Sequence, residues 1–197
     1  DRTVARLLAE RLQSDPALRH VAVVNSGIAG NRLLNDASAP FVGPSLLHRF
    51  DRDVLDKAGV RWIVVLSGSN DVTASGLLKD PKDQVSAGQI IAGYRELISR
   101  AHARGLKIYA ATFPPRGEVT TGRFVLSAEN QAKRATVNTW LRNSGAFDGV
   151  IDFEAHLLDP AQPARMRAAY DSGDHVHPND TGYRVMASAI DLGLFRD

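Results

Sequence analysis

The sequence of 197 residues contains no cysteine. This absence excludes disulfide bonds, thiolate zinc sites and a cysteine nucleophile, but it leaves the compartment open because cysteine-free bacterial proteins can be secreted or cytosolic. Long hydrophobic runs are absent as well: the apolar run 62–66 is far shorter than the roughly 20 residues that cross a bilayer. We therefore do not expect a transmembrane protein.

The sequence also lacks an excess of charge of one sign. Its 24 Lys and Arg residues are balanced by 22 Asp and Glu residues, which gives a formal net charge of +2. Nucleic acid is thus not an expected partner. The remaining composition, with 44% hydrophobic and 23% charged residues, is typical of one compact soluble domain, so we expect a single domain over residues 1–197.

Strand-like and helix-like segments alternate along the chain. Short runs rich in β-branched and aromatic residues predict four strands, over residues 20–25, 61–67, 106–112 and 149–153. Apolar residues at three- and four-residue intervals predict helices over residues 1–13, 44–57, 86–104, 127–143 and 180–192. Because such alternation forms βαβ crossovers, the pattern predicts a parallel sheet covered on both faces, a three-layer α/β/α sandwich.

A carboxylate and an imidazole lie three residues apart just before the last predicted helix. Asp174 can accept the Nδ1 proton of His177, and Pro178 would then start the helix. A histidine oriented in this way can take a proton from a nucleophile at Nε2, which is the logic of the serine hydrolase triad. The simpler interpretation is that the two residues fill a turn and cap a helix, and the pair alone does not decide between the two.

Two further residues are predicted to follow strands at the edge of the sheet where ligands bind. The backbone N–H of Gly27 and the side-chain amide of Asn70 can each stabilise an oxyanion there. The simpler interpretation is a tight turn with positive φ at Gly27 and Gly30, and a helix N-cap at Asn70 and Asp71. Their joint occurrence with the Asp-x-x-His pair favours a catalytic site.

The three motifs together resemble a known enzyme family. The chain reads N-x-G-x-x-G-N from Asn25, G-x-N-D from Gly68 and D-x-x-H-P-N from Asp174. This combination, which spans residues 25–183, resembles the later sequence blocks of the SGNH (GDSL-type) esterase and lipase family.

The resemblance implies a fold, an activity and a set of roles. The fold would be a flavodoxin-like α/β/α sandwich, and the activity the hydrolysis of acyl or acetyl esters through an acyl-enzyme, with no metal and no organic cofactor. His177 would be the general base and Asp174 its orienting carboxylate, while the Gly27 N–H and the Asn70 amide would form the oxyanion hole. The substrate would be a small-molecule, glycan or lipid ester.

One departure from the family pattern concerns the nucleophile. The family serine lies in a G-D-S motif after the first strand, and no Gly-Asp-Ser occurs in the 197 residues. We therefore expect this serine and its strand upstream of Asp1, in a separate N-terminal fragment or in an omitted segment. Ser26, Ser67 and Ser69 adjoin the oxyanion candidates, but each fits a turn hydrogen bond better than a nucleophile.

Other interpretations of these motifs remain open at the level of sequence. His175 and His177 with Asp180 resemble an H-x-H-x-D metal set, but the spacing is one residue too long and no histidine cluster supports it. The G-x-x-G turn lacks the fingerprint of a dinucleotide site. The alternative function is a non-catalytic relative that binds glycan or lipid, which would explain the missing G-D-S literally.

The substrate pocket has three candidate residues. Ile28, Phe113 and Pro114 follow predicted strands at the edge that would carry the active site, so they can wall an acyl pocket. A rigid loop is the alternative role for Phe113 and Pro114. No residue selects among acetylated sugars, aryl esters, lysophospholipids and thioesters.

Overall fold

The computed structural model describes residues 3–37, 42–78, 80–116 and 126–196. The chain divides into two compact units. One unit comprises Ser26–Phe113 and Thr120–Val150, and the other comprises Asp1–Asn25, Pro114–Val119 and Ile151–Asp197. Of the helices in these described ranges, none combines the length and apolar character that a membrane span requires.

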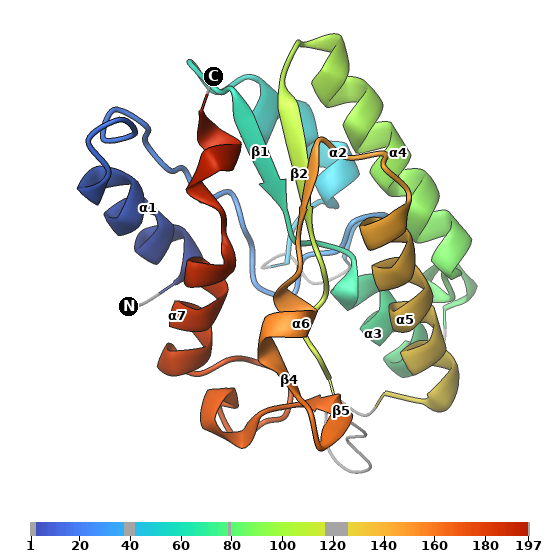
Figure 1. Cartoon of the computed structure of the whole chain (residues 1–197). Helices are drawn as coiled ribbons and strands as arrows, with labels where there is room; N and C mark the ends of the chain where they lie inside the picture. The colour runs from blue at the N-terminus through green and yellow to red at the C-terminus, as the bar shows by residue number, and fades with distance from the viewer. Residues whose placement is uncertain (1–2, 38–41, 79, 117–125, 197) are drawn as a thin grey trace. The chain divides into compact units, whose positions relative to one another are not determined.

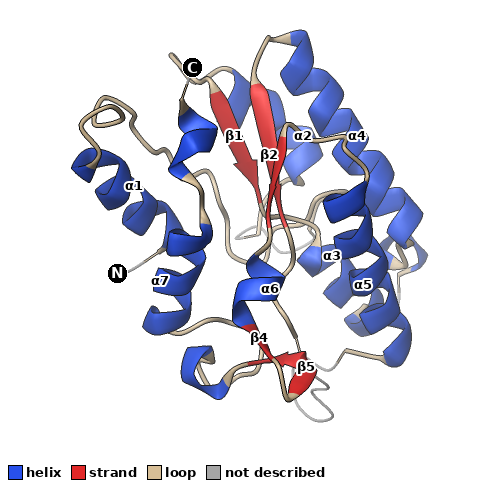
Figure 2. Ribbon diagram, viewed as in Figure 1, coloured by secondary structure: helices blue, strands red, loops and turns tan. Residues whose placement is uncertain are grey.

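The first of these units contains most of a three-stranded sheet (Figure 2). β1 (Trp62–Val65) pairs in parallel with β2 (Lys107–Ala111), in a register that places Trp62 opposite Lys107 and Val65 opposite Ala110. β3 (Gly149–Ile151) follows β2 in the order β1-β2-β3. β1 is therefore an outer strand of the sheet.

Helices accompany the sheet in this unit (Figure 1). They are α2 (Leu46–Phe50), which continues as a π-helical turn over Asp51–Leu55, α3 (Ser69–Leu77), α4 (Ala87–Ala103) and α5 (Ala128–Asn143). A capping box of Ser86 and Gln89 starts α4, and the Ser127 side chain caps α5. α4 packs on β2, α2 and α5, which places its apolar stripe in the core.

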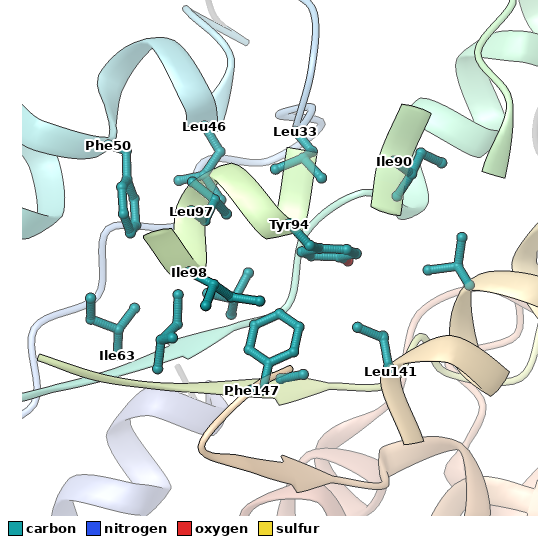
Figure 3. Packing of buried hydrophobic residues seen from close by; sticks show 14 of the residues in the cluster. Leu33, Leu46, Phe50, Ile63, Ile90, Tyr94, Leu97, Ile98, Leu141 and Phe147 are labelled. Carbon is teal, nitrogen blue, oxygen red and sulfur yellow. The ribbon is translucent and has the colours of Figure 1, made fainter. Parts of the chain in front are cut away.

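The core of this unit is built around Tyr94 of α4 (Figure 3). The Tyr94 ring stacks on Trp140 with centroids 6.2 Å apart and meets Phe147 edge-on at 5.7 Å. Burial raises the pKa of the Tyr94 phenol, whose hydroxyl donates to the carbonyl of Ser67. This hydrogen bond ties the start of the loop after β1 to the core.

The other unit contains the two ends of the described chain. α1 (Val4–Ser14) packs on α7 (Asp180–Ala189), and Arg11 donates from its guanidinium to the carbonyl oxygens of Ala187 and, at 2.8 Å, Ile190. α6 (Phe153–Leu157) also packs on α7 and leads into an antiparallel hairpin of β4 (Leu158–Asp159) and β5 (Gln162–Met166). Three short 3₁₀ helices complete the description: Pro81–Asp83 in the sheet-bearing unit, and Ala168–Tyr170 and Leu192–Phe195 in this one.

The prediction of an α/β fold with a parallel sheet is confirmed. The five predicted helices form, and strands form within three of the four predicted runs. The strand predicted over residues 20–25 is wrong, because a strand needs a hydrogen-bonded neighbour and no described strand pairs with this segment. The sequence did not predict α3, α6 or the β4–β5 hairpin, and the prediction of a single domain stays a prediction.

Candidate functional site

The loop before α7 brings Asp174 and His177 together. His177 Nδ1 lies 2.5 Å from Asp174 Oδ2. The other carboxylate oxygen, Oδ1, accepts the backbone N–H groups of His177 at 2.8 Å and Val176 at 2.9 Å, and the Ser172 hydroxyl at 3.0 Å. Three donors of the loop therefore fix one oxygen of the carboxylate while the other binds the imidazole.

The hydrogen bonds to Asp174 also determine its ionisation. Partial burial alone would raise the pKa of Asp174, but the hydrogen bonds from His177, Val176 and Ser172 outweigh it and hold this pKa well below its usual range. Asp174 is thus ionised at neutral pH. An ionised carboxylate keeps the proton of a neutral imidazole on Nδ1, makes Nε2 the basic nitrogen, and stabilises the imidazolium that forms when Nε2 takes a proton.

The same loop holds a second His–Asp pair. His175 Nδ1 lies 2.7 Å from Asp171 Oδ2, and Asp171 Oδ1 accepts the N–H groups of Gly173 and His175. His175 has a φ of 62°, which is unusual for a residue other than glycine. Because His175 and His177 bind different carboxylates, they do not converge as an H-x-H-x-D metal set, and the described residues contain no group of three or more metal-ligating side chains.

A His–Asp pair alone does not mark the site in this chain. His48 binds Asp36 and His102 binds Asp148, both at 2.9 Å and both in the sheet-bearing unit. What singles out His177 is the D-x-x-H-P-N sequence around it, because the Asp171 carboxylate that binds His175 also accepts N–H groups of the same loop.

Asn179, not Pro178, caps the helix behind the pair. Its side-chain oxygen accepts the N–H groups of Thr181 and Gly182, and α7 begins at Asp180. Its amide donates to the carbonyl oxygens of Ala169 and Asp171. The sequence prediction that Pro178 starts the helix is wrong, because the capping side chain follows the proline by one residue.

Asn70 lies in the sheet-bearing unit, as the second residue of α3. Its Nδ2 donates to the carbonyl oxygen of Asn31 at 2.9 Å. The N-cap position belongs to Gly68, with a φ of 109°, so the N-cap interpretation of Asn70 and Asp71 is wrong. Asn70 therefore does not cap the helix, and its amide faces the loop that follows Gly30.

Asp71 fixes that loop from inside the unit. Its carboxylate oxygens accept the backbone N–H groups of Leu33 at 2.7 Å and Leu34 at 2.9 Å, and only 1% of its surface is exposed. Burial raises the pKa of Asp71, and the two backbone hydrogen bonds offset this only in part. Asp71 thus places the loop against which Asn70 is bound.

Gly27 lies in an irregular segment of the same unit. The positive φ in this motif belongs to Gly30, at 75°, and not to Gly27, so the turn interpretation holds for Gly30 alone. Gly27 does not follow a strand, because residues 20–25 do not form one. Ser26, just before it, donates its hydroxyl to the carbonyl of Asp53 at 2.8 Å, a contact between distant positions and not the local turn hydrogen bond that the sequence predicts.

The three pocket candidates differ in their environment. Phe113 is 1% exposed, belongs to the core, and exchanges hydrogen bonds of 2.8 and 3.0 Å with the Asn138 side chain, which favours the interpretation as a rigid segment. Pro114 is half-buried, and Ile28 is 37% exposed. A role for these residues in a substrate pocket stays a prediction.

Sequence reasoning missed two residues that connect the oxyanion candidates. Asn31 is the last residue of the N-x-G-x-x-G-N motif, so the sequence pointed to this position. The sequence did not show that Asn31 is a centre of several hydrogen bonds. Arg49 carries no motif, and only the structure shows that its buried guanidinium reaches both Ser26 and Asn31.

A carboxylate-bound histidine on an α/β fold has the geometry of a general base with its orienting group. The sequence model of the GDSL-like lipase/acylhydrolase family matches residues 1–185, and the chain belongs to this family. No curated protein is significantly similar to the chain in sequence.

Solved structures of esterases share the fold at low sequence identity. The M. smegmatis aryl esterase is 14% identical, with 96% of this chain and 82% of that chain covered at a TM-score of 0.69. A catalytic mutant of an acetylxylan esterase from Geobacillus stearothermophilus is 20% identical, with 95% and 78% covered at a TM-score of 0.68. The acetyl xylan esterase AlAXEase is 22% identical, with 95% and 88% covered at a TM-score of 0.66. Together with the family, these neighbours support ester hydrolysis in general.

Proposed function

We propose that this protein hydrolyses carboxylic esters through an acyl-enzyme. His177 acts as general base, Asp174 orients it, and the Gly27 N–H and the Asn70 amide stabilise the oxyanion. The nucleophile is a serine in a G-D-S segment that is not among the 197 residues. The observation that carries the proposal is the 2.5 Å contact between His177 and Asp174, with the carboxylate held by further N–H groups of its own loop.

The proposed reaction has two balanced halves. The serine oxygen attacks the ester carbonyl carbon while its proton passes to His177 Nε2, and the negative charge forms on the carbonyl oxygen between the two oxyanion donors. The tetrahedral intermediate collapses, and the leaving alkoxide takes the proton from His177. Water then attacks the acyl-enzyme by the same route, which releases the acid and restores the serine.

The position of β1 on the outside of the described sheet supports the proposal of an additional strand that carries the serine. The run from Trp62 to Leu66 is apolar at every position, as in a parallel strand covered on both faces. In the described chain Ile63 and Val65 are buried, but Val64 is 36% and Leu66 41% exposed. Among the described strands β1 pairs with β2 alone, so a further strand could pair on its other side.

Two names among the structural neighbours suggest the kind of ester. An aryl esterase and acetylxylan esterases share the fold, so an activated aryl acetate is a suitable first substrate. The Geobacillus structure is named as a catalytic mutant with serine changed to alanine, which agrees with a serine nucleophile in that protein.

The decisive experiment compares the same substitution at the two histidines of the loop, in the protein that includes the G-D-S segment. His177→Asn should lower kcat on an aryl acetate by about 10³-fold or more with little change in KM. His175→Asn is the matched control, because asparagine tolerates the positive φ and Asp171 is a separate partner. Activity of His177→Asn within tenfold of the unchanged protein would refute the assignment.

Labelling with a fluorophosphonate tests the serine and the alternative function together. The protein with the G-D-S segment should be labelled at that serine, and residues 1–197 alone should not be labelled at Ser26, Ser67 or Ser69. A folded protein with the segment that neither labels nor turns over an ester would instead support the glycan- or lipid-binding alternative.

A further inference from the structure

One buried arginine contacts the residue before Gly27 and the side chain of Asn31, whose backbone carbonyl binds Asn70. Arg49 lies in α2 with 5% of its surface exposed. We propose that Arg49 is a positioning residue of the oxyanion hole: its guanidinium holds the Ser26–Gly27 peptide group and Asn31, and so orients the Gly27 N–H and the Asn70 amide. This inference rests on the proposed function, because it takes those two donors as its starting point.

The contact with Ser26 acts on Gly27 through the geometry of the peptide bond. Arg49 Nη1 donates to the carbonyl oxygen of Ser26 at 2.7 Å. That carbonyl and the Gly27 N–H belong to one planar peptide group, which is trans because the described residues include no cis peptide bond. In a trans peptide the N–H points away from the carbonyl oxygen. A bond that fixes the carbonyl direction therefore fixes the N–H direction, and a cationic donor also polarises the group and strengthens the N–H as a donor.

The contact with Asn31 acts on Asn70. Arg49 Nε and Nη2 both donate to Asn31 Oδ1, at 3.1 and 2.9 Å. The amide of Asn31 donates in turn to the carbonyl oxygens of Val42 and Pro44, so its side chain is held from both ends. The backbone carbonyl of the same Asn31 accepts Asn70 Nδ2 at 2.9 Å. Because the Asn70 amide is planar, one fixed N–H also sets the direction of the other.

The positive charge of Arg49 is balanced within the same cluster. Nη1 of Arg49 lies 3.2 Å from Asp53 Oδ2. A hydrogen bond from Arg52, assisted by Arg49, outweighs burial and lowers the pKa of Asp53 to about 2, so this carboxylate is ionised at neutral pH. Lysine at position 49 would keep the charge but not the fork of donors that reaches Ser26 and Asn31 together.

The test is a double-mutant cycle with Asn70, in the protein that includes the G-D-S segment and with an aryl acetate as substrate. Asn70→Ala should lower kcat by about 10²- to 10³-fold. Arg49→Lys should lower kcat by about tenfold or more, with KM within about threefold, because the donors are displaced but not removed. In the Asn70→Ala background, Arg49→Lys should cost clearly less than it does alone.

Another buried arginine of this unit provides a matched control. Arg32 is also 5% exposed and binds Asp83 at 2.5 Å, with further bonds to the carbonyl oxygens of Asn35 and Asp36. Arg32→Lys should lower the melting temperature but leave the kcat of the folded protein within about twofold. A kcat loss from Arg32→Lys equal to that from Arg49→Lys would overturn the proposal, since it would show a general loosening of the unit.

A readout independent of turnover comes from NMR. In Arg49→Lys, the backbone amide signal of Gly27 and the side-chain amide signals of Asn70 should shift, while the amide of Gly145 should not. Unchanged kcat and unchanged signals at Gly27 and Asn70 would refute the role of Arg49. An ineffective Asn70→Ala would refute the oxyanion assignment of the proposed function itself.

The proposal stays testable if Arg49→Lys does not fold. Asn31→Ala leaves the guanidinium and the backbone carbonyl that binds Asn70 in place, but removes the acceptor that links the two. It should show the same kcat loss with unchanged KM, and an unchanged kcat would count against the proposal.

Discussion

Replacement of Asp71 by asparagine tests how much the Asp71 carboxylate, which holds the loop behind the proposed oxyanion hole, contributes to stability. Both oxygens of Asp71 accept backbone N–H groups, from the buried Leu33 and the partly buried Leu34. Asparagine keeps the shape but offers one oxygen and one NH₂ group. One backbone N–H therefore loses its acceptor and faces another donor.

The expected loss of stability follows from the one backbone N–H group that loses its acceptor. One unsatisfied buried donor costs about 1–3 kcal/mol of the free energy of unfolding. For a chain of this size about 1 kcal/mol corresponds to about 2–4 °C, so Asp71→Asn should lower the melting temperature by about 2–12 °C. Urea unfolding and calorimetry measure both quantities. Asp80→Asn is the matched control, because Asp80 is an exposed cap where asparagine serves equally well.

The pH dependence gives a second, sign-specific check. Burial raises the pKa of Asp71 in the folded state above the unfolded value of about 3.9. The unchanged protein should therefore lose part of its stability advantage over Asp71→Asn as the pH rises from about 4 through the raised pKa. The difference between the two proteins cancels the contributions of all other carboxylates.

Two results would refute this reasoning. If Asp71→Asn unfolds at the same urea concentration as the unchanged protein, the two backbone hydrogen bonds do not hold the loop. If the stability difference instead grows as the pH rises above 4, the pKa of Asp71 is lowered in the folded state and not raised.

Three further predictions concern the loop that carries His177 and the helix that follows it. Gly182→Ala should destabilise the protein clearly more than Gly88→Ala. A Cβ added at Gly182 would lie 2.7 Å from the Tyr170 carbonyl oxygen and 2.7 Å from Pro178 Cβ, whereas the nearest atom to a Cβ added at Gly88 is 3.7 Å away. Equal unfolding midpoints of the two variants would contradict this prediction. Asp174→Asn should lower kcat by about 10³- to 10⁴-fold with little change in KM, because an amide can donate to Nδ1 and so favour the unproductive tautomer. The low pKa of Asp174 also means that its contribution to stability is present above about pH 4 and is lost as the pH falls further, a dependence that Asp174→Asn should lack.

Five of the helices and the three strands of the parallel sheet could be predicted because their signals are local. The capping box at Ser86 and the N-cap at Ser127 start α4 and α5 where the sequence pattern places them. The segment 20–25 has a strand-like composition but no described partner, and composition cannot supply a hydrogen-bonded neighbour. α3 was missed because Ser69–Leu77 contains serine, threonine and glycine without a clear apolar stripe.

By itself, the sequence determined the Asp174–His177 pair, because residues three apart in a turn lie close enough for their side chains to meet. The motifs also determined the family. Only the tertiary structure decided what holds Asn70 and the Gly27 peptide, since those partners are distant in sequence: Asp71 reaches Leu33 across 38 positions, and Arg49 reaches Ser26 across 23. A buried polar group must find a partner, and which one it finds depends on how the elements pack and not on any local pattern.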